Sequence, residues 1–205
     1  MTVRIVALGD STTAGTPGFK SPLEAPPSGR GDVESQYAHW LHGTHADWQI
    51  LNRGVNGERS DQIRQRFERD VLEEMPDVVV IIAGVNDIYQ GRPATAVQAE
   101  LQAMYEAARA AQIAVVAGTI IPFNTATPEQ NAGMRAVNDW IRGCVESQPG
   151  LTFCDTRAAV AAPGFPDRLA SSPDDLHPSA DGYRLMAVAL EPAIRRAVAT
   201  RKGFR

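Results

Sequence analysis

Short runs of β-branched residues alternate with longer amphipathic segments along all 205 residues, and this alternation constrains the fold most strongly. The runs predict strands at residues 4–8, 48–52, 77–83, 113–119 and, more weakly, 151–154. The clearest run, residues 78–82, is continuously apolar, which is typical of a strand in a parallel sheet covered on both faces. The alternation therefore predicts βαβ units and an α/β fold built on a parallel sheet.

Between these strands, apolar residues recur at helical spacing. The spacing predicts helices at residues 34–42, 60–74, 95–111 and 128–146. A last helix is expected to begin with Ser179 as its N-cap. Tyr183, Met186 and Leu190 should then face the core. Pro192 lies inside this helical pattern and is expected either to kink the helix or to mark its restart.

Residues 16–32 do not fit the alternation, because they are rich in proline and glycine and poor in apolar residues. They predict a long loop inserted after the first strand of a single domain spanning residues 1–205. We expect Phe19 and Leu23 of this loop to contribute to the wall of a pocket.

Charge and hydropathy exclude several classes of partner. The net charge of −4 disfavours a nucleic-acid partner, since nucleic-acid binders usually present a basic face. The longest apolar run, residues 78–85, is far shorter than the roughly 20 residues that cross a bilayer, so no membrane span is expected. No signal peptide is recognisable, which favours a cytoplasmic location. Cys144 and Cys154 lack the spacing of a zinc site and are interpreted as buried thiols, with a single bridge as the alternative.

Polar residues follow three of the predicted strands. Ser11 comes after the first strand in the segment Gly9-Asp10-Ser11, Gly57 lies in the loop after the second, and Asn86 follows the third. Taken alone, each segment is also compatible with an ordinary turn. Because ligands bind beyond the carboxyl ends of parallel strands, we expect these residues to meet at one edge of the sheet.

A fourth polar segment, Asp174-Asp175-Leu176-His177-Pro178, precedes the last helix. The proline biases His177 toward an extended backbone, which leaves the imidazole free to point outward. A carboxylate three residues earlier, Asp174, is placed to accept the Nδ1 proton and to fix the tautomer in which Nε2 is a base. His39, His42 and His45 are interpreted as structural or exposed. Together the four segments contain a nucleophile, a base, an orienting carboxylate and oxyanion donors, which indicates acyl transfer.

These four segments resemble the four sequence blocks of the SGNH/GDSL hydrolases, in the same order and over nearly the whole chain. The resemblance implies a flavodoxin-like three-layer α/β/α sandwich with strand order 2-1-3-4-5. It implies a catalytic triad of Ser11, His177 and Asp174, with Asp175 in no catalytic role. It also implies an oxyanion hole formed by the Ser11 and Gly57 amides and the Asn86 side chain. Glu58 and Arg59 depart from the family, which more often has an aspartate and a small hydroxylated residue there.

The resemblance implies a serine esterase, lipase or acylhydrolase that cleaves small-molecule esters and needs neither a cofactor nor a metal. The alternative from another class is a non-catalytic nucleotide- or flavin-binding protein on the same sheet. A phosphate-binding turn would lead directly into a helix, whereas this chain is expected to enter the proline-rich loop. An inactive interaction module is a third alternative. The acyl chain length, the alcohol and the oligomeric state are not indicated by the sequence.

Overall fold

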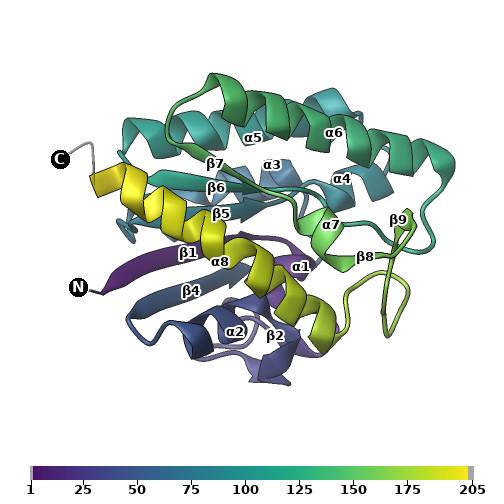
Figure 1. Cartoon of the computed structure of the whole chain (residues 1–205), viewed down its shortest axis with the longest axis horizontal. Coiled ribbons are helices and arrows are strands. Elements are labelled where there is room, and N and C mark those ends of the chain that lie inside the picture. Colours follow the sequence, from purple (N-terminus) through teal and green to yellow (C-terminus); the bar gives the residue numbers. More distant parts are fainter. Residues whose placement is uncertain (1, 203–205) are drawn as a thin grey trace.

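The computed structural model describes residues 2–202, and its centre is a five-stranded parallel sheet. The strands are β1 (Val3–Gly9), β4 (Trp48–Gly54), β5 (Val78–Ile82), β6 (Ala114–Gly118) and β7 (Leu151–Cys154). Their order, β4-β1-β5-β6-β7, is the predicted 2-1-3-4-5 arrangement (Figure 1). The predicted fold class is therefore confirmed, and each strand lies within two residues of its predicted bounds.

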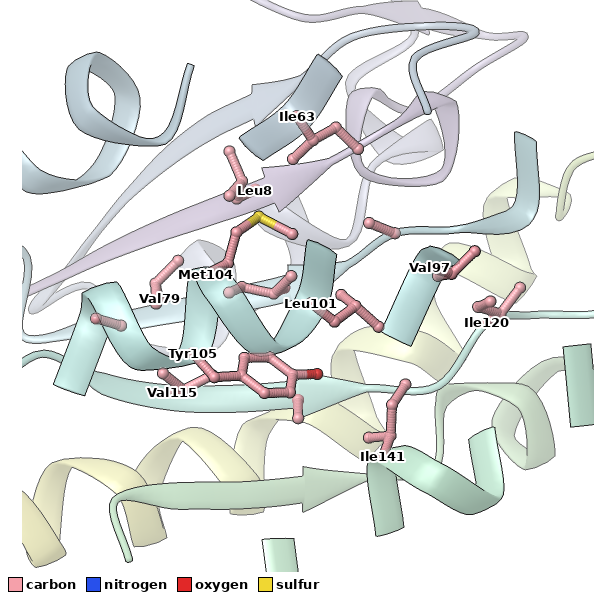
Figure 2. Close-up of a cluster of buried hydrophobic side chains, with 14 of the residues drawn as sticks. Leu8, Ile63, Val79, Val97, Leu101, Met104, Tyr105, Val115, Ile120 and Ile141 are labelled. Carbon is pink, nitrogen blue, oxygen red and sulfur yellow. The ribbon is translucent and has the colours of Figure 1, made fainter. Parts of the chain in front are cut away.

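Helices cover both faces of the sheet, because successive strand residues point to opposite sides. Val6 and Leu8 of β1 lie in one core, whereas Ile5 and Ala7 lie in the other. The first core is covered by α3 (Ser60–Gln65), α4 (Val85–Tyr89), α5 (Ala94–Ala110) and α6 (Pro128–Ser147). Figure 2 shows this side, where Met104 and Leu101 of α5 pack onto the strands. The second core is covered by α2 (Tyr37–Thr44), α7 (Thr156–Val160) and α8 (Ala180–Lys202).

Apolar stripes of two helices face the core, and that of the last helix does so as predicted. Met134, Val137 and Ile141 of α6 are buried. Tyr183, Met186 and Leu190 of α8 are also fully buried. The hydroxyl of Ser179 accepts the Gly182 amide at 3.3 Å, which confirms the predicted N-cap of α8.

The prediction that a helix restarts at Pro192 is wrong, because α8 runs through this residue to Lys202 without a break. The missing proline amide leaves the carbonyl of residue 188 without its helical donor. Val188 is 62% exposed, so this carbonyl lies on the water-facing side of the helix, where solvent replaces the lost bond. None of the helices among residues 2–202 is both long and apolar enough to cross a membrane.

The carboxyl ends of β1, β4 and β5 lie level with one another. Gly9 pairs in register with Gly54 of β4 and with Ile82 of β5. The one-turn helix α1 (Ser11–Ala14) packs directly on this edge. A Cβ on Gly54 would lie only 2.1 Å from the Ala14 amide nitrogen, so only glycine permits this close approach.

Residues 16–32 contain more regular structure than a predicted loop. Two short antiparallel strands, β2 (Phe19–Lys20) and β3 (Arg30–Gly31), form a hairpin-like pair. A one-turn 3-10 helix, η1 (Val33–Ser35), then leads into α2. A second small pair, β8 (Ala161–Ala162) and β9 (Phe165–Leu169), lies between α7 and α8.

Both cysteines are buried free thiols, so the alternative of a bridge between them is wrong. Burial raises the pKa of Cys144 and raises that of Cys154 to about 12. Each thiol instead lies near an oxygen acceptor, Gln102 Oε1 for Cys144 and the Ala189 carbonyl for Cys154.

Candidate active site

Ser11 is the first residue of α1, immediately after β1 ends at Gly9. The side chain of Asp10 caps this helix by accepting the Thr12 amide at 2.9 Å, and Gly15 ends it in a left-handed conformation. Burial raises the pKa of Asp10 to about 7, and Asp87 adds to this effect while the hydrogen bonds from Thr12 oppose it. Ser11 is therefore held on a short, tightly capped turn at the edge of the sheet.

His177 and Asp174 form a hydrogen-bonded pair in the segment before α8. The Asp174 Oδ2 atom lies 2.7 Å from His177 Nδ1, while Asp174 Oδ1 accepts the His177 amide at 2.8 Å. Burial acts to raise the pKa of Asp174, but the hydrogen bonds from His177 and Leu176 outweigh it and hold this pKa below its ordinary value. An ionised Asp174 with a proton on Nδ1 leaves His177 Nε2 free to act as a base.

One cavity of about 180 Å³ brings three of the five predicted site residues together at the carboxyl edge of the sheet. Ser11, Asn86 and His177 all line it, although they lie on three separate segments. No hydrogen bond joins the Ser11 hydroxyl to the imidazole among the described residues. Such catalytic hydrogen bonds are commonly long in free enzymes and shorten in the substrate complex.

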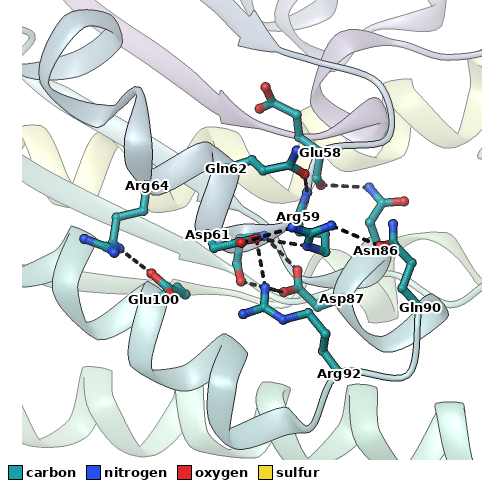
Figure 3. A network of polar contacts seen from close by, with 11 residues as sticks. Glu58, Arg59, Asp61, Gln62, Arg64, Asn86, Asp87, Gln90, Arg92 and Glu100 are labelled. Carbon is teal, nitrogen blue, oxygen red and sulfur yellow. Dashed lines mark hydrogen bonds and ion pairs between the residues drawn. The ribbon is translucent and has the colours of Figure 1, made fainter.

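The third polar position, Asn86, lies on α4 and is anchored by its side chain. Its Nδ2 atom donates to the Glu58 carbonyl oxygen at 2.9 Å (Figure 3). Gly57 precedes Glu58 and has a φ of 78°, a left-handed conformation that favours glycine. Gly57 does not line the cavity, whereas its neighbour Asn56 does. The Asn86 amide and the Gly57 loop are thus joined through Glu58.

The α4 helix is fixed to α3 by a buried carboxylate. Asp87 is fully buried and accepts the Ser60 amide at 2.7 Å and the Ser60 hydroxyl at 2.9 Å. Arg92 pairs with Asp87 at 2.6 Å and with Asp61 at 2.8 Å (Figure 3). These contacts hold the turn that carries Asn86. Asp87 directly follows Asn86 in the sequence, but the sequence does not predict this role for it.

The second aspartate of the histidine segment has a different partner. Asp175 adopts a φ of 62°, and its carbonyl accepts the Asn124 amide at 2.8 Å. The Asn124 side chain donates to Asp175 Oδ1 at 3.0 Å and accepts the Leu169 amide at 2.8 Å. Asn124, which no sequence motif indicates, therefore ties the histidine segment to β9.

Apart from Thr12, the rest of the cavity wall is formed by apolar side chains. They are Val85, Tyr89, Ile121, Phe123 and Leu176. The Tyr89 and Phe123 rings meet edge to face with their centroids 5.8 Å apart. Tyr89 is 55% exposed and Leu176 38% exposed, so both lie at the mouth of the cavity.

The structure also tests three expectations about neighbouring residues. Phe19 and Leu23 do not line the cavity, because Phe19 is buried within its own loop beside Gly29. Arg59 does not line it and pairs with Asp61 at 3.0 Å, so the interpretation of this residue as part of a salt bridge, favoured over a place in the pocket wall, is confirmed. The chain was also expected to enter the proline-rich segment directly after the first strand, but it forms the short helix α1 first.

A larger cavity of about 370 Å³ lies at the opposite, amino edge of the sheet, near the starts of β6 and β7. Tyr105 and Arg109 line it together with mostly apolar or uncharged residues. Its described lining contains no histidine, carboxylate or cysteine, and its only hydroxyls belong to Tyr105 and Thr200. The smaller cavity is therefore the one with groups suited to nucleophilic chemistry. Residues 2–202 contain no cluster of three or more histidine, cysteine or acidic side chains that would hold a metal ion.

Comparisons with known proteins agree with this fold. The model of the GDSL-like lipase/acylhydrolase family matches residues 7–185. An acetylxylan esterase of Geobacillus stearothermophilus is 28% identical over 160 residues, which cover 68% of this chain and 69% of the relative. The structure of a G-D-S-L family protein from Desulfitobacterium hafniense DCB-2 superposes with a TM-score of 0.76 at 24% identity, covering 94% of this chain and 99% of that one. A GDSL-like lipase from Bacteroides thetaiotaomicron superposes with a TM-score of 0.74 at 22% identity, covering 95% and 88%.

Proposed function

The chain belongs to the GDSL-like lipase/acylhydrolase family, and from this premise we propose that it hydrolyses carboxylic esters through a Ser11–His177–Asp174 triad. The observation that carries the proposal is the shared cavity, which Ser11 and His177 both line while Asp174 Oδ2 lies 2.7 Å from His177 Nδ1. Nucleophile, base and orienting carboxylate are the parts that acyl transfer requires.

In the proposed reaction, His177 Nε2 takes the Ser11 hydroxyl proton as Oγ attacks the ester carbonyl. The negative oxygen of the tetrahedral intermediate is stabilised by the Ser11 and Gly57 amides and by Asn86 Nδ2. The protonated His177 then gives its proton to the departing alkoxide, which leaves an acyl group on Ser11. A water molecule, deprotonated by His177, attacks this acyl-enzyme and releases the carboxylic acid and free Ser11.

The size of the cavity favours a short acyl group. Its volume of about 180 Å³ is smaller than the roughly 300–1,000 Å³ of pockets that enclose drug-sized ligands. Apolar side chains such as Ile121 and Phe123 suit a small alkyl group. The similarity to an acetylxylan esterase supports an acetyl ester as the first substrate to test.

The test is hydrolysis of 4-nitrophenyl acetate by the wild type and by Ser11→Ala. We expect kcat to fall by at least about a thousandfold, because the nucleophile is lost. An alkyl fluorophosphonate should add one phosphonyl group to the wild type and none to Ser11→Ala, as measured by intact mass. Ser147→Ala, at a serine near the end of α6, is the matched control and should retain wild-type activity and labelling. Equal hydrolysis by Ser11→Ala and wild type would show that Ser11 is not the nucleophile.

A further inference from the structure

One buried arginine, Arg66, connects the ends of two strands to the loop that carries Gly57. It lies at the end of α3, and its side chain is only 8% exposed. One terminal nitrogen, Nη2, donates to the Gly9 carbonyl at 2.8 Å, and the other, Nη1, donates to the Arg53 carbonyl at the same distance. Gly9 and Arg53 lie in the last residues of β1 and β4, so Arg66 joins the strand ends beside Ser11.

The same guanidinium holds Glu58. Arg66 Nε donates to Glu58 Oε2 at 2.6 Å, and Nη1 also pairs with the buried carboxylate of Asp70 at 2.6 Å. Glu58 thereby has two attachments, since its carboxylate is bound by Arg66 and its carbonyl accepts the Asn86 side chain. The peptide that contains the Glu58 nitrogen also contains the Gly57 carbonyl, so Glu58 restrains the loop on the side next to Gly57.

We propose that Glu58 and Arg66 are positioning residues that hold the two proposed oxyanion donors, the Gly57 amide and Asn86 Nδ2, in a fixed arrangement relative to Ser11. This inference rests on the proposed function, because the donors matter only if a negative oxygen forms there. Arg66 is held in place by its hydrogen bonds to the Gly9 and Arg53 carbonyls. Through its bond to Arg66, Glu58 in turn fixes the loop relative to the strand ends. The arrangement is preorganised, as stabilisation of a developing charge requires.

The planar fork of arginine suits this task, because its several N–H donors reach two carbonyls and two carboxylates at once. Gly57 itself has a left-handed φ and no side chain, and a Cβ built there meets nothing within 4 Å. The loop therefore gains no packing at Gly57. It is restrained before Gly57 by the Asn56 amide, which donates to Glu24 Oε1 at 3.1 Å, and after Gly57 by the Glu58 contacts.

The central test is Glu58→Ala, a change in a partly exposed loop that leaves Arg66 paired with Asp70 and both carbonyls. We expect kcat for 4-nitrophenyl acetate to fall by about tenfold to a hundredfold, less than the hundredfold to thousandfold of losing a donor outright. KM should change little, because the ground-state ester does not depend on the oxyanion donors. Glu58→Gln should recover most of kcat, since its amide oxygen can still accept from Arg66 Nε.

Arg69→Ala is the matched control. Arg69 also pairs with Asp70, at 2.6 Å, but its side chain is 64% exposed and, among the described residues, it forms no hydrogen bond with Glu58, Gly9 or Arg53. We expect its kcat to match the wild type. Amide hydrogen exchange gives a second readout that is independent of turnover, with faster exchange in residues 55–58 of Glu58→Ala and unchanged exchange there in Arg69→Ala.

The outcomes separate this inference from the proposed function. A wild type that hydrolyses no ester and takes no fluorophosphonate label contradicts the proposed function. An active wild type with an unchanged kcat and unchanged loop exchange in Glu58→Ala overturns the inference alone. A fall in kcat that Glu58→Gln does not recover also overturns it, since the lost contact would then not be the Arg66 hydrogen bond.

Discussion

Two adjacent aspartates, Asp174 and Asp175, show how neighbouring residues of one type acquire different tasks. Asp174 accepts from the His177 ring and from two backbone amides. Asp175 points to Asn124 and adopts a left-handed backbone conformation. The difference comes from backbone geometry, because the turn at Asp175 sends its carboxylate away from the imidazole.

This contrast predicts unequal effects of the same substitution. Asp174→Asn should lower kcat on the order of 10⁴-fold, because the amide nitrogen would oppose the Nδ1 proton and favour the wrong tautomer of His177. Asp175→Asn should remain close to wild type, since asparagine tolerates a positive φ and keeps an oxygen for Asn124. Steady-state kinetics of both variants, with circular dichroism as a fold check, decide the matter. Equal losses would mean that the two aspartates share one role.

At the scale of residues, the sequence indicates chemical groups better than the contacts that hold them. That Ser11, Asn86 and His177 line one cavity could be predicted, because each follows a strand or precedes a helix in a recognisable motif. Arg66 and Asn124 could not, because they act on partners 57 and 51 residues away along the chain. Contacts between a side chain and a distant backbone carbonyl or turn leave no periodic signal in the sequence.

Among the elements, the one-turn helix α1 is capped by a buried carboxyl group. Asp10 caps α1 although it is only 1% exposed, and its pKa is raised to about 7 by burial. Between the ordinary carboxyl pKa near 4 and this value, the native state binds a proton that the unfolded state does not. The stability therefore falls as pH rises from about 4 to about 7 and is not regained above it.

Asp10→Asn tests this effect, because asparagine keeps the oxygen that accepts the Thr12 amide but carries no charge. The free energy of unfolding of the variant, minus that of the wild type, should increase between pH 4 and pH 7 by up to about 4 kcal/mol. Urea unfolding at pH 4, 5, 6, 7 and 8 measures this difference. A difference that is constant with pH would show that Asp10 does not titrate in this range.

The helices and strands also show where local sequence pattern no longer predicts secondary structure correctly. Buried strands such as β5 were predicted within two residues, since a short, continuously apolar run between polar residues is typical of a covered strand. The predicted helix at 60–74 is instead divided into α3, which ends at Gln65, and a short π-helical stretch, η2 (Glu68–Leu72). Arg66 lies at this division and turns its side chain toward the strand carbonyls, which is a tertiary requirement that helical periodicity does not record.

For the whole molecule, the level ends of β1, β4 and β5 determine how the cavity is built. Three segments that begin at residues 11, 56 and 85 leave the sheet at one edge, and the segment that carries Leu176 and His177 closes the space from the side of α8. The strand order was predicted from the resemblance, and with it the meeting of these segments. The size of the cavity depended on side chains such as Phe123 and Leu176 and was not predicted.

The small cavity predicts a preference for short acyl chains. The kcat/KM for 4-nitrophenyl esters should fall from acetate through butyrate to octanoate, because a longer chain leaves the cavity for water. Leu176→Ala should shift the preference toward butyrate by opening the mouth of the cavity. Leu185→Ala, which is also 38% exposed but lies on α8 away from the cavity, should keep the wild-type profile. An unaltered profile in Leu176→Ala would show that this wall does not limit chain length.

The proposed nucleophile and the proposed base lie on segments that differ in stability. Ser11 stands on the edge of a doubly covered sheet, whereas His177 belongs to an irregular, mostly exposed stretch secured by Asp174 and by Asn124. Regions with few buried contacts open at lower free energy than the core. On mild heating, we therefore expect fluorophosphonate labelling to decline at a temperature below the melting of the far-ultraviolet circular dichroism signal, so that inactivation precedes denaturation.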